Sequence, residues 1–199
     1  MNDRQQFNLY YGGRLMQHRY SEVLNLPVIC ADSGKKAGVV KDILFDLENR
    51  EVKALLLEHT GLVPGKRLVL LKELLNLGND AAIINDAGYV RNIGRKAFKA
   101  AFGESKELFG GDKGSLLGRR VYSKAGGELG IVKDVIFNIQ SGKIEAFEIS
   151  DGILQDIIQG RKLLPLFGRV ELGEEVAVVE KEAVDEMKES GGGIKNKLL

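Results

Sequence analysis

The sequence predicts an all-β dominated protein with two small, bulged antiparallel β-barrels in tandem, a short helical linker between them and a short C-terminal helix. Three observations support this fold class. The segment GVVKDILFD at Gly38–Asp46 returns almost unchanged as GIVKDVIFN at Gly130–Asn138, 92 residues later. Short runs rich in β-branched residues alternate with turn residues about every ten positions, which is typical of small barrels and sandwiches. The apolar spacing inside the repeated segment also departs from the period of two that a regular strand shows.

The repeat extends over most of the chain. Residues 24–58 align with residues 116–150 without a gap, and further on the offset becomes 95, so that residues 65–68 align with residues 160–163. A surface hairpin loop tolerates such an insertion. Two long copies indicate a duplicated domain, because a solenoid needs three or more short repeats. We expect five parts: an N-terminal extension at 1–20, a barrel at 21–90, a partly helical linker at 91–113, a second barrel at 114–184 and a tail at 185–199.

Each copy contains the same series of expected strands. In the first copy they are PVICA, GVVKDILFDL, EVKALLLEH, RLVLL and AAIIN, and in the second RRVYS, LGIVKDVIFNI, KIEAFEIS, RKLLPL and EVAVVE. Turns such as DSGKK, ENR, KAGGE and QSG separate the strands, since Gly, Asn and Asp favour the backbone angles of tight turns. Helix is expected at 71–78, within the linker at 92–111, and at 180–190.

The repeated segment has one residue more than a regular strand. Ile43 and Phe45 are two positions apart and face the core, but the preceding core residue is Val40, three positions earlier. This spacing predicts a β-bulge at the repeated Lys-Asp pair, which comprises Lys41, Asp42, Lys133 and Asp134. The next strand has the same irregular spacing around Ala54 and Ala146. Because bulges bend a short sheet strongly, a barrel fits better than a flat sandwich.

Asp42 and Asp134 allow two interpretations. In a functional interpretation they are two carboxylates of a twofold-related site. In a structural interpretation each carboxylate accepts backbone N–H bonds at its bulge, while the neighbouring Lys points to solvent. The structural interpretation is favoured.

The pattern resembles the PRC-barrel family. The resemblance rests on Leu117–Val121, on the Gly-x-Val-x-Asp-x-x-Phe motif of both copies, and on the Arg-Lys-Leu-Leu-Pro stretch at Arg161–Pro165. The family is named for the cytoplasmic domain of the photosynthetic reaction-centre H subunit, and the pattern is also similar to the C-terminal domain of the bacterial ribosome maturation factor RimM. The first copy departs from the pattern, with Leu26-Pro27 where the second has Gly118-Arg119. The resemblance implies an adaptor or assembly module without a general catalytic motif, and the fold alone does not supply a function.

Composition and motifs argue against several classes of function. The net charge of +1, from 29 basic and 28 acidic residues, lacks the basic excess of proteins that mainly grip phosphate backbones. The two histidines, His18 and His59, have no metal-ligand spacing, and Cys30 is expected to be a small core residue. Nucleotide-binding and hydrolase fingerprints are missing from the sequence. We therefore expect no catalytic residue, no metal and no cofactor.

The cellular setting is expected to be the cytoplasm. A single cysteine excludes an intrachain disulfide, which fits a reducing compartment. The first residues lack the apolar core of a signal peptide, and no apolar run approaches the roughly 20 residues that span a bilayer.

Two apolar groups are candidates for a binding surface. Leu44 and Ile136 lie between inward-facing residues and are apolar in both copies, so we expect them to be covered, either by the two barrels packing on each other or by a homodimer contact. The second group occurs in the second copy alone and consists of Ile153, Leu154, Ile157 and Ile158. Their helical spacing suits a short helix that plugs the barrel mouth or a surface for a partner.

The linker supplies a third candidate, a basic patch next to aromatic residues. Its cations are Arg91, Arg95, Lys96 and Lys99, interspersed with Phe98 and Phe102. Such a basic amphipathic segment either packs as a helix between domains, which is favoured, or contacts RNA or anionic lipid.

Three hypotheses of function follow. The leading one is a non-catalytic scaffold or assembly adaptor that binds another protein or a second copy of itself. The second is a ribosome- or RNA-associated maturation or assembly factor, which predicts co-sedimentation with ribosomal particles that high salt abolishes. The third is a peripheral membrane-associated protein without a transmembrane anchor. An enzyme is the least supported class.

Overall fold

The computed structural model describes residues 16–58, 65–102, 116–152, 156, 160–166, 170–173 and 175–189, with the backbone alone at 188 and 189. The chain divides into two compact units. Unit 1 comprises residues 1–19, 116–138 and 144–199, and unit 2 comprises residues 20–115 and 139–143. Strands dominate both units, which confirms the all-β class.

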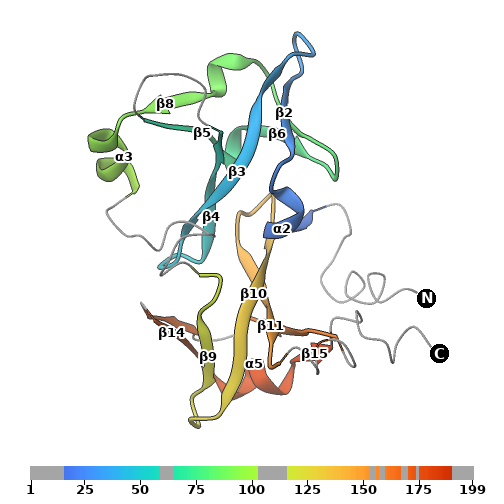
Figure 1. Ribbon diagram of the computed structural model, residues 1–199, viewed down its shortest axis with the longest axis vertical. Coiled ribbons are helices and arrows are strands. Elements are labelled where there is room, and N and C mark those ends of the chain that lie inside the picture. The colour runs from blue at the N-terminus through green and yellow to red at the C-terminus, as the bar shows by residue number, and fades with distance from the viewer. Residues whose placement is uncertain are drawn as a thin grey trace, which may run out of the picture. The chain divides into compact units, whose positions relative to one another are not determined.

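Unit 2 begins with a short helix and continues as a seven-stranded sheet (Figure 1). Its elements are α2 (Tyr20–Val23), β2 (Pro27–Cys30), β3 (Lys36–Asp46), β4 (Glu51–Leu57), β5 (Lys66–Leu70), the 3-10 turn η1 (Leu71–Glu73), β6 (Leu74–Leu77), β7 (Ala82–Ile84), the 3-10 turn η2 (Ala87–Tyr89), β8 (Arg91–Ile93) and α3 (Arg95–Phe102). The strand order is β6-β7-β2-β3-β4-β5-β8. The long strand β3 pairs with β2 along its first half and with β4 along its second half. The sheet therefore curls around β3.

Unit 1 repeats this plan. Its elements are β1 (Gln17–Arg19), β9 (Arg120–Ser123), β10 (Glu128–Asn138), β11 (Ile144–Ser150), β12 (Lys162–Pro165), β13 (Val170–Leu172), β14 (Val176–Val179), α5 (Lys181–Asp185) and β15 (Lys188–Glu189). The strand order is β13-β14-β9-β10-β11-β12-β15. Strand β10 is the equivalent of β3, because it pairs with β9 along its first half and with β11 along its second half. The duplication in the sequence is thus a duplication of the fold.

Strand β1 lies in the segment that the sequence suggests is an N-terminal extension. It runs antiparallel to β10, with Gln17 opposite Asn138 and Arg19 opposite Ile136. Unit 1 therefore contains a strand from the start of the chain, far from the rest of its sheet in sequence.

One strand pair in each unit is parallel, while the other strand pairs of the described residues are antiparallel, as expected for these barrels. β7 runs parallel to β2, and β14 runs parallel to β9. In each repeat a late strand pairs with the first strand of the repeat on one side and with its preceding strand in sequence on the other. The direction of this pairing depends on the path of the intervening chain, which the apolar pattern of a strand does not encode.

Bulges interrupt the long strands at equivalent places. In β3 the register shifts between Val40 and Asp42, and in β10 it shifts between Val132 and Asp134. Each long strand has a second register shift, where the extra residue belongs to the partner strand. In unit 2 the extra residue of β4 lies opposite Leu44 and Phe45. In unit 1 the extra residue of β11 lies opposite Ile136 and Phe137. These are the positions at which the apolar spacing of the sequence departs from two. The extra residues increase the local twist and bend of the sheet.

The core consists of the side chains that the period of two places on the inner face. Ile43 and Phe45 of β3, and Val135 and Phe137 of β10, are fully buried. Burying a side chain of this size contributes roughly 1.5–3 kcal/mol. These residues hold each sheet in its curled form.

The expected helix at 71–78 is wrong. The 3-10 turn η1 occupies Leu71–Glu73, and strand β6 follows it and pairs with β7. Leu71 and Leu77 are both buried. Their apolar spacing fits a helix as well as it fits this turn-and-strand path, and strand pairing overrides the local preference. Helices α3 and α5 lie in the linker and near the C-terminus, as expected.

Gly130 in β10 is a position that only glycine fits well. Its φ is +137°, and a Cβ atom there would lie 2.4 Å from the Ser150 carbonyl oxygen. At the equivalent Gly38 a Cβ atom would meet the flexible Leu57 side chain at 3.1 Å.

We predict that Gly130→Ala lowers the free energy of unfolding by about 3 kcal/mol through backbone strain and overpacking. Gly38→Ala should lower it by about 1 kcal/mol or less. Urea denaturation compares the two, and equal losses would contradict this explanation.

Candidate interaction surfaces

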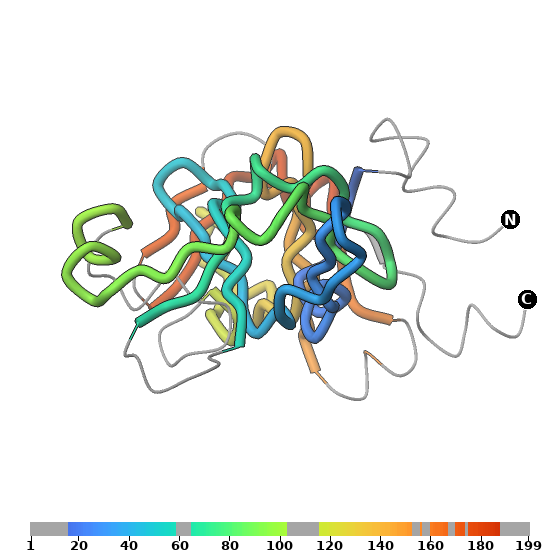
Figure 2. Tube along the Cα trace, turned by 90° about the horizontal axis from the view of Figure 1, so that it is seen from above, coloured from blue at the N-terminus to red at the C-terminus, as the bar shows by residue number. Residues whose placement is uncertain are grey.

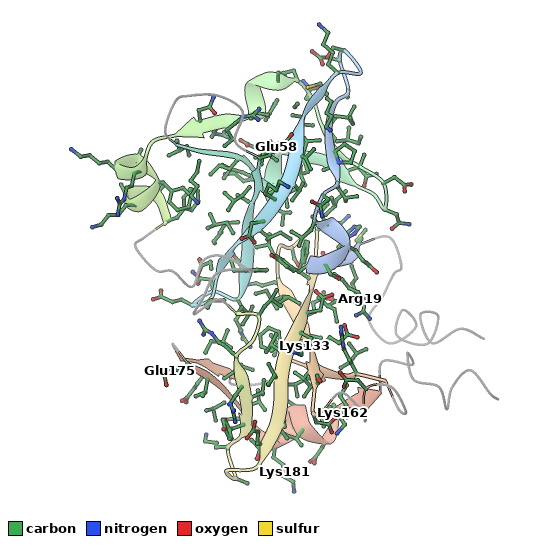
Figure 3. All side chains as sticks on the ribbon, viewed as in Figure 1. Arg19, Glu58, Lys133, Lys162, Glu175 and Lys181 are labelled. Atoms are coloured by element: carbon green, nitrogen blue, oxygen red, sulfur yellow. The ribbon has the colours of Figure 1, made fainter. Side chains whose placement is uncertain are left out.

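The aspartate of each Lys-Asp pair bonds to the backbone of its own bulge. The Asp42 Oδ1 atom accepts a hydrogen bond from the Ile43 N–H at 2.7 Å. The Asp134 Oδ1 atom accepts one from the Val135 N–H at 2.8 Å. The lysine before each aspartate is exposed, and Lys133 is labelled on β10 in Figure 3. At each bulge this geometry is that of a structural device.

In unit 2 the bulge also binds helix α2. The Tyr20 hydroxyl donates a hydrogen bond to the Asp42 Oδ1 atom at 3.0 Å. The Tyr20 ring lies against Phe45, with 6.0 Å between the ring centroids. Asp42 thus connects α2, the bulge and the core of the unit.

Leu44 is covered by a helix of its own unit. It is fully buried in a cluster with Ala54, Leu56, Leu68 and Phe98. Helix α3 supplies Phe98, and it lies on the outer side of the unit 2 strands in both views (Figures 1 and 2). This corrects the expectation that the second barrel or a partner covers Leu44, because the linker helix occupies the place.

Ile136 is the equivalent residue of unit 1, and it is also buried. It is 3% exposed and packs with Ala146 and Leu163. Neither of the two repeated apolar positions is therefore an open surface.

The outer face of unit 1 is more polar than that of unit 2. Glu148 stands where unit 2 has Leu56, and its side chain is 8% exposed. The Glu148 carboxylate accepts a hydrogen bond from the Arg19 guanidinium at 2.6 Å and lies 3.5 Å from the Arg161 guanidinium. Arg19 belongs to β1, so this ion pair fixes the N-terminal strand to β11. Figure 3 labels Arg19 beside these strands.

The four residues of the predicted basic patch do not form one surface, because Arg91 is paired with an acidic residue. Arg91 at the start of β8 donates two hydrogen bonds to the Glu73 carboxylate of η1, one of them 2.5 Å long. This bidentate ion pair balances the Arg91 charge and lowers the pKa of Glu73. Arg95, Lys96 and Lys99 are exposed on α3. The basic surface is therefore the helix, without Arg91.

Strand β6 presents a surface that is not among the candidates expected from the sequence. It is the end strand of the unit 2 sheet, and its Leu75 side chain is 61% exposed. Among the described residues, Leu75 is the one large apolar side chain that is mostly exposed to solvent. The register with β7 shifts between Leu74 and Asn76, so Leu75 is the extra residue of a bulge. The signal available in the sequence was the Leu74-Leu75 doublet, since a strand turns consecutive side chains to opposite faces.

The remaining candidates divide into described and undescribed residues. Ile153, Leu154, Ile157, Ile158 and His59 lie outside the residues that the structure describes. Of the described candidates, His18 on β1 is 8% exposed, and its ring centroid lies 6.3 Å from that of Phe137. Cys30 is 2% exposed. Burial raises the pKa of its thiol, with further contributions from Asp32 and Asp86. A raised pKa disfavours the thiolate, which is the nucleophilic form.

The described residues contain neither a metal-binding cluster nor a membrane-spanning helix. No group of three or more His, Cys, Asp or Glu side chains among them is arranged to hold a metal ion. No helix within these parts of the chain is long and apolar enough to cross a membrane.

A family model described as the PRC-barrel domain matches the chain twice, at residues 16–88 and 114–184. The two matches cover more than half of the chain, and each contains one copy of the repeated segment. No curated protein matches the chain.

The Glu73–Arg91 pair makes a pH-dependent contribution to stability. The hydrogen bond from Arg91 lowers the Glu73 pKa in the folded state, so the stabilisation is present above the unfolded-state pKa and is lost as the pH falls through the folded-state pKa. We predict that Glu73→Gln lowers the free energy of unfolding by about 1 kcal/mol at neutral pH. The difference between the two proteins should shrink as the pH drops toward and below about 4. Urea denaturation across this range measures it, with the exposed Glu48→Gln as control. A difference that stays constant with pH would contradict the assignment.

Proposed function

Since the chain belongs to the PRC-barrel family, with two copies of the domain, we propose that it is a non-catalytic scaffold or assembly adaptor that binds another protein through strand β6. PRC-barrel domains are known as protein-interaction and assembly modules, and the family is generally non-catalytic. The observation that carries the proposal is the exposed Leu75 on an end strand of the sheet.

The chemistry of an end strand supports a protein partner. Its outer edge offers backbone N–H and C=O groups that an extended segment of another protein pairs with. Leu75 adds an apolar side chain next to these groups, and apolar contacts at the centre of an interface supply much of its affinity. The bulge at Leu75 also limits indiscriminate pairing, because an irregular edge does not match a regular strand along its length.

The proposal also includes a cellular location and an alternative role. The cytoplasm is the proposed location, and it is supported by a single cysteine that is buried in unit 2. A ribosome- or RNA-associated assembly role is the alternative. In that role the exposed cations of α3 would contact RNA phosphates, and salt-sensitive co-sedimentation with ribosomal particles is the result that would select it.

Site-specific photo-crosslinking in the native host tests the proposal. A photoreactive residue at position 75 should capture a defined protein. The same residue at Lys124 should not, although the Lys124 side chain is also 63% exposed. The variant Leu75→Lys should weaken capture at a neighbouring β6 position by roughly tenfold or more, because it removes a central apolar contact. Its thermal stability should stay close to that of the wild type, as for other exposed substitutions. Equal labelling from positions 75 and 124, or no labelled protein above background, would contradict the proposal.

A further inference from the structure

Helix α3 carries a set of cations on a fixed support. Its sequence, RKAFKAAF, contains three basic residues and no acidic one. Phe98 is buried against the outer face of the sheet, and Phe102 packs beside it, with 5.1 Å between the two ring centroids. These two residues are four positions apart, so one side of the helix faces the sheet. The basic side chains are exposed, and nitrogen-tipped side chains extend from α3 away from the strands in Figure 3.

The chain before the helix does not cancel this charge. Arg91 is neutralised by Glu73, so that local pair contributes no net charge. Between it and the helix stand Asn92, Ile93 and Gly94, all uncharged. Arg95, Lys96 and Lys99 are thus three exposed basic side chains on one short helix of a protein whose overall charge is close to zero.

The surface suits a flat anionic partner better than a nucleic acid. Single-stranded RNA is gripped by exposed aromatic rings on which its bases stack. Both phenylalanines of α3 pack toward the sheet, and no aromatic side chain is among the large exposed apolar residues of the described chain. Ala97, Ala100 and Ala101 are exposed, and their small side chains let the helix approach a plane closely. Dense phosphate headgroups in a plane are what an anionic bilayer provides.

We propose that the basic side of α3 binds the surface of an anionic lipid bilayer. The contact is electrostatic, with Phe98 remaining on the sheet of unit 2. Each cation near such a surface strengthens binding by about fivefold, so three give an effect on the order of 100-fold. This inference is independent of the proposed protein contact, because β6 and β8 are the opposite ends of the unit 2 strand order and α3 follows β8.

Vesicle co-sedimentation of the full chain tests the proposal. Vesicles of phosphatidylcholine mixed with phosphatidylglycerol should bind the protein at low salt, and pure phosphatidylcholine vesicles should not. Raising the salt to roughly 0.5 M should release it, because the charges are exposed and screened. The triple variant Arg95→Gln, Lys96→Gln, Lys99→Gln should bind the anionic vesicles on the order of 100-fold more weakly. A matched variant, Lys35→Gln, Lys36→Gln, Lys41→Gln, removes the same charge from exposed positions of unit 2 and should retain binding.

A second measurement places the contact on the helix. A fluorescent label at Ala100→Cys should shift its emission on addition of anionic vesicles, and one at Ser33→Cys should not. The native Cys30 is buried, so labelling is selective. The proposal is overturned if wild-type protein ignores anionic vesicles, if the two triple variants lose binding equally, or if single-stranded RNA displaces the protein from vesicles at low salt. The last result would assign the helix to nucleic acid instead.

Discussion

One extra residue in the longest strand of each repeat determines how the rest of the sheet is arranged. The bulge lets β3 and β10 pair with one neighbour along the first half and with another along the second half. An extra residue leaves backbone amides outside the regular ladder, and the following aspartate accepts one of them. Without that acceptor a buried N–H would lose its partner, at a cost of about 1–3 kcal/mol. The aspartate of the repeated Lys-Asp pair is therefore a requirement of the curled sheet.

The two copies share this device and differ on their outer faces. Unit 2 has Leu56 where unit 1 has Glu148. In unit 2, Leu56 belongs to an apolar face that α3 covers. In unit 1, Glu148 binds Arg19 and so joins this face to β1. Phe98 holds α3 in place, so the cations of the helix occupy a defined surface. The end strand β6 with its exposed Leu75 lies in the same unit. Duplication gave two units with equivalent sheets. The features that we connect with binding occur where the two units differ.

Part of this arrangement follows from the sequence. The repeat locates the bulges, because Val40, Ile43 and Phe45 break the period of two in the same way as their counterparts. The parallel pairing of β2 with β7 could not be predicted from the sequence, since an apolar run indicates that a strand is buried but not the direction in which it pairs. The apolar spacing of residues 71–77 predicts a helix, but it suits a turn followed by a strand equally well. The cover on Leu44 and the Glu73–Arg91 pair depend on contacts between residues far apart in the chain, which a single sequence without other information does not specify.

The aspartate of each Lys-Asp pair holds the bulge, and the lysine does not. The most direct test compares Asp134→Ala with Lys133→Ala by urea denaturation at neutral pH. Asp134 is 2% exposed and accepts the Val135 N–H, so its loss should lower the free energy of unfolding by about 1–3 kcal/mol. Removing the exposed Lys133 side chain should change it by about 0.5 kcal/mol at most. A neutral Asp134→Ala variant, or a Lys133→Ala variant that is equally destabilised, would contradict the claim.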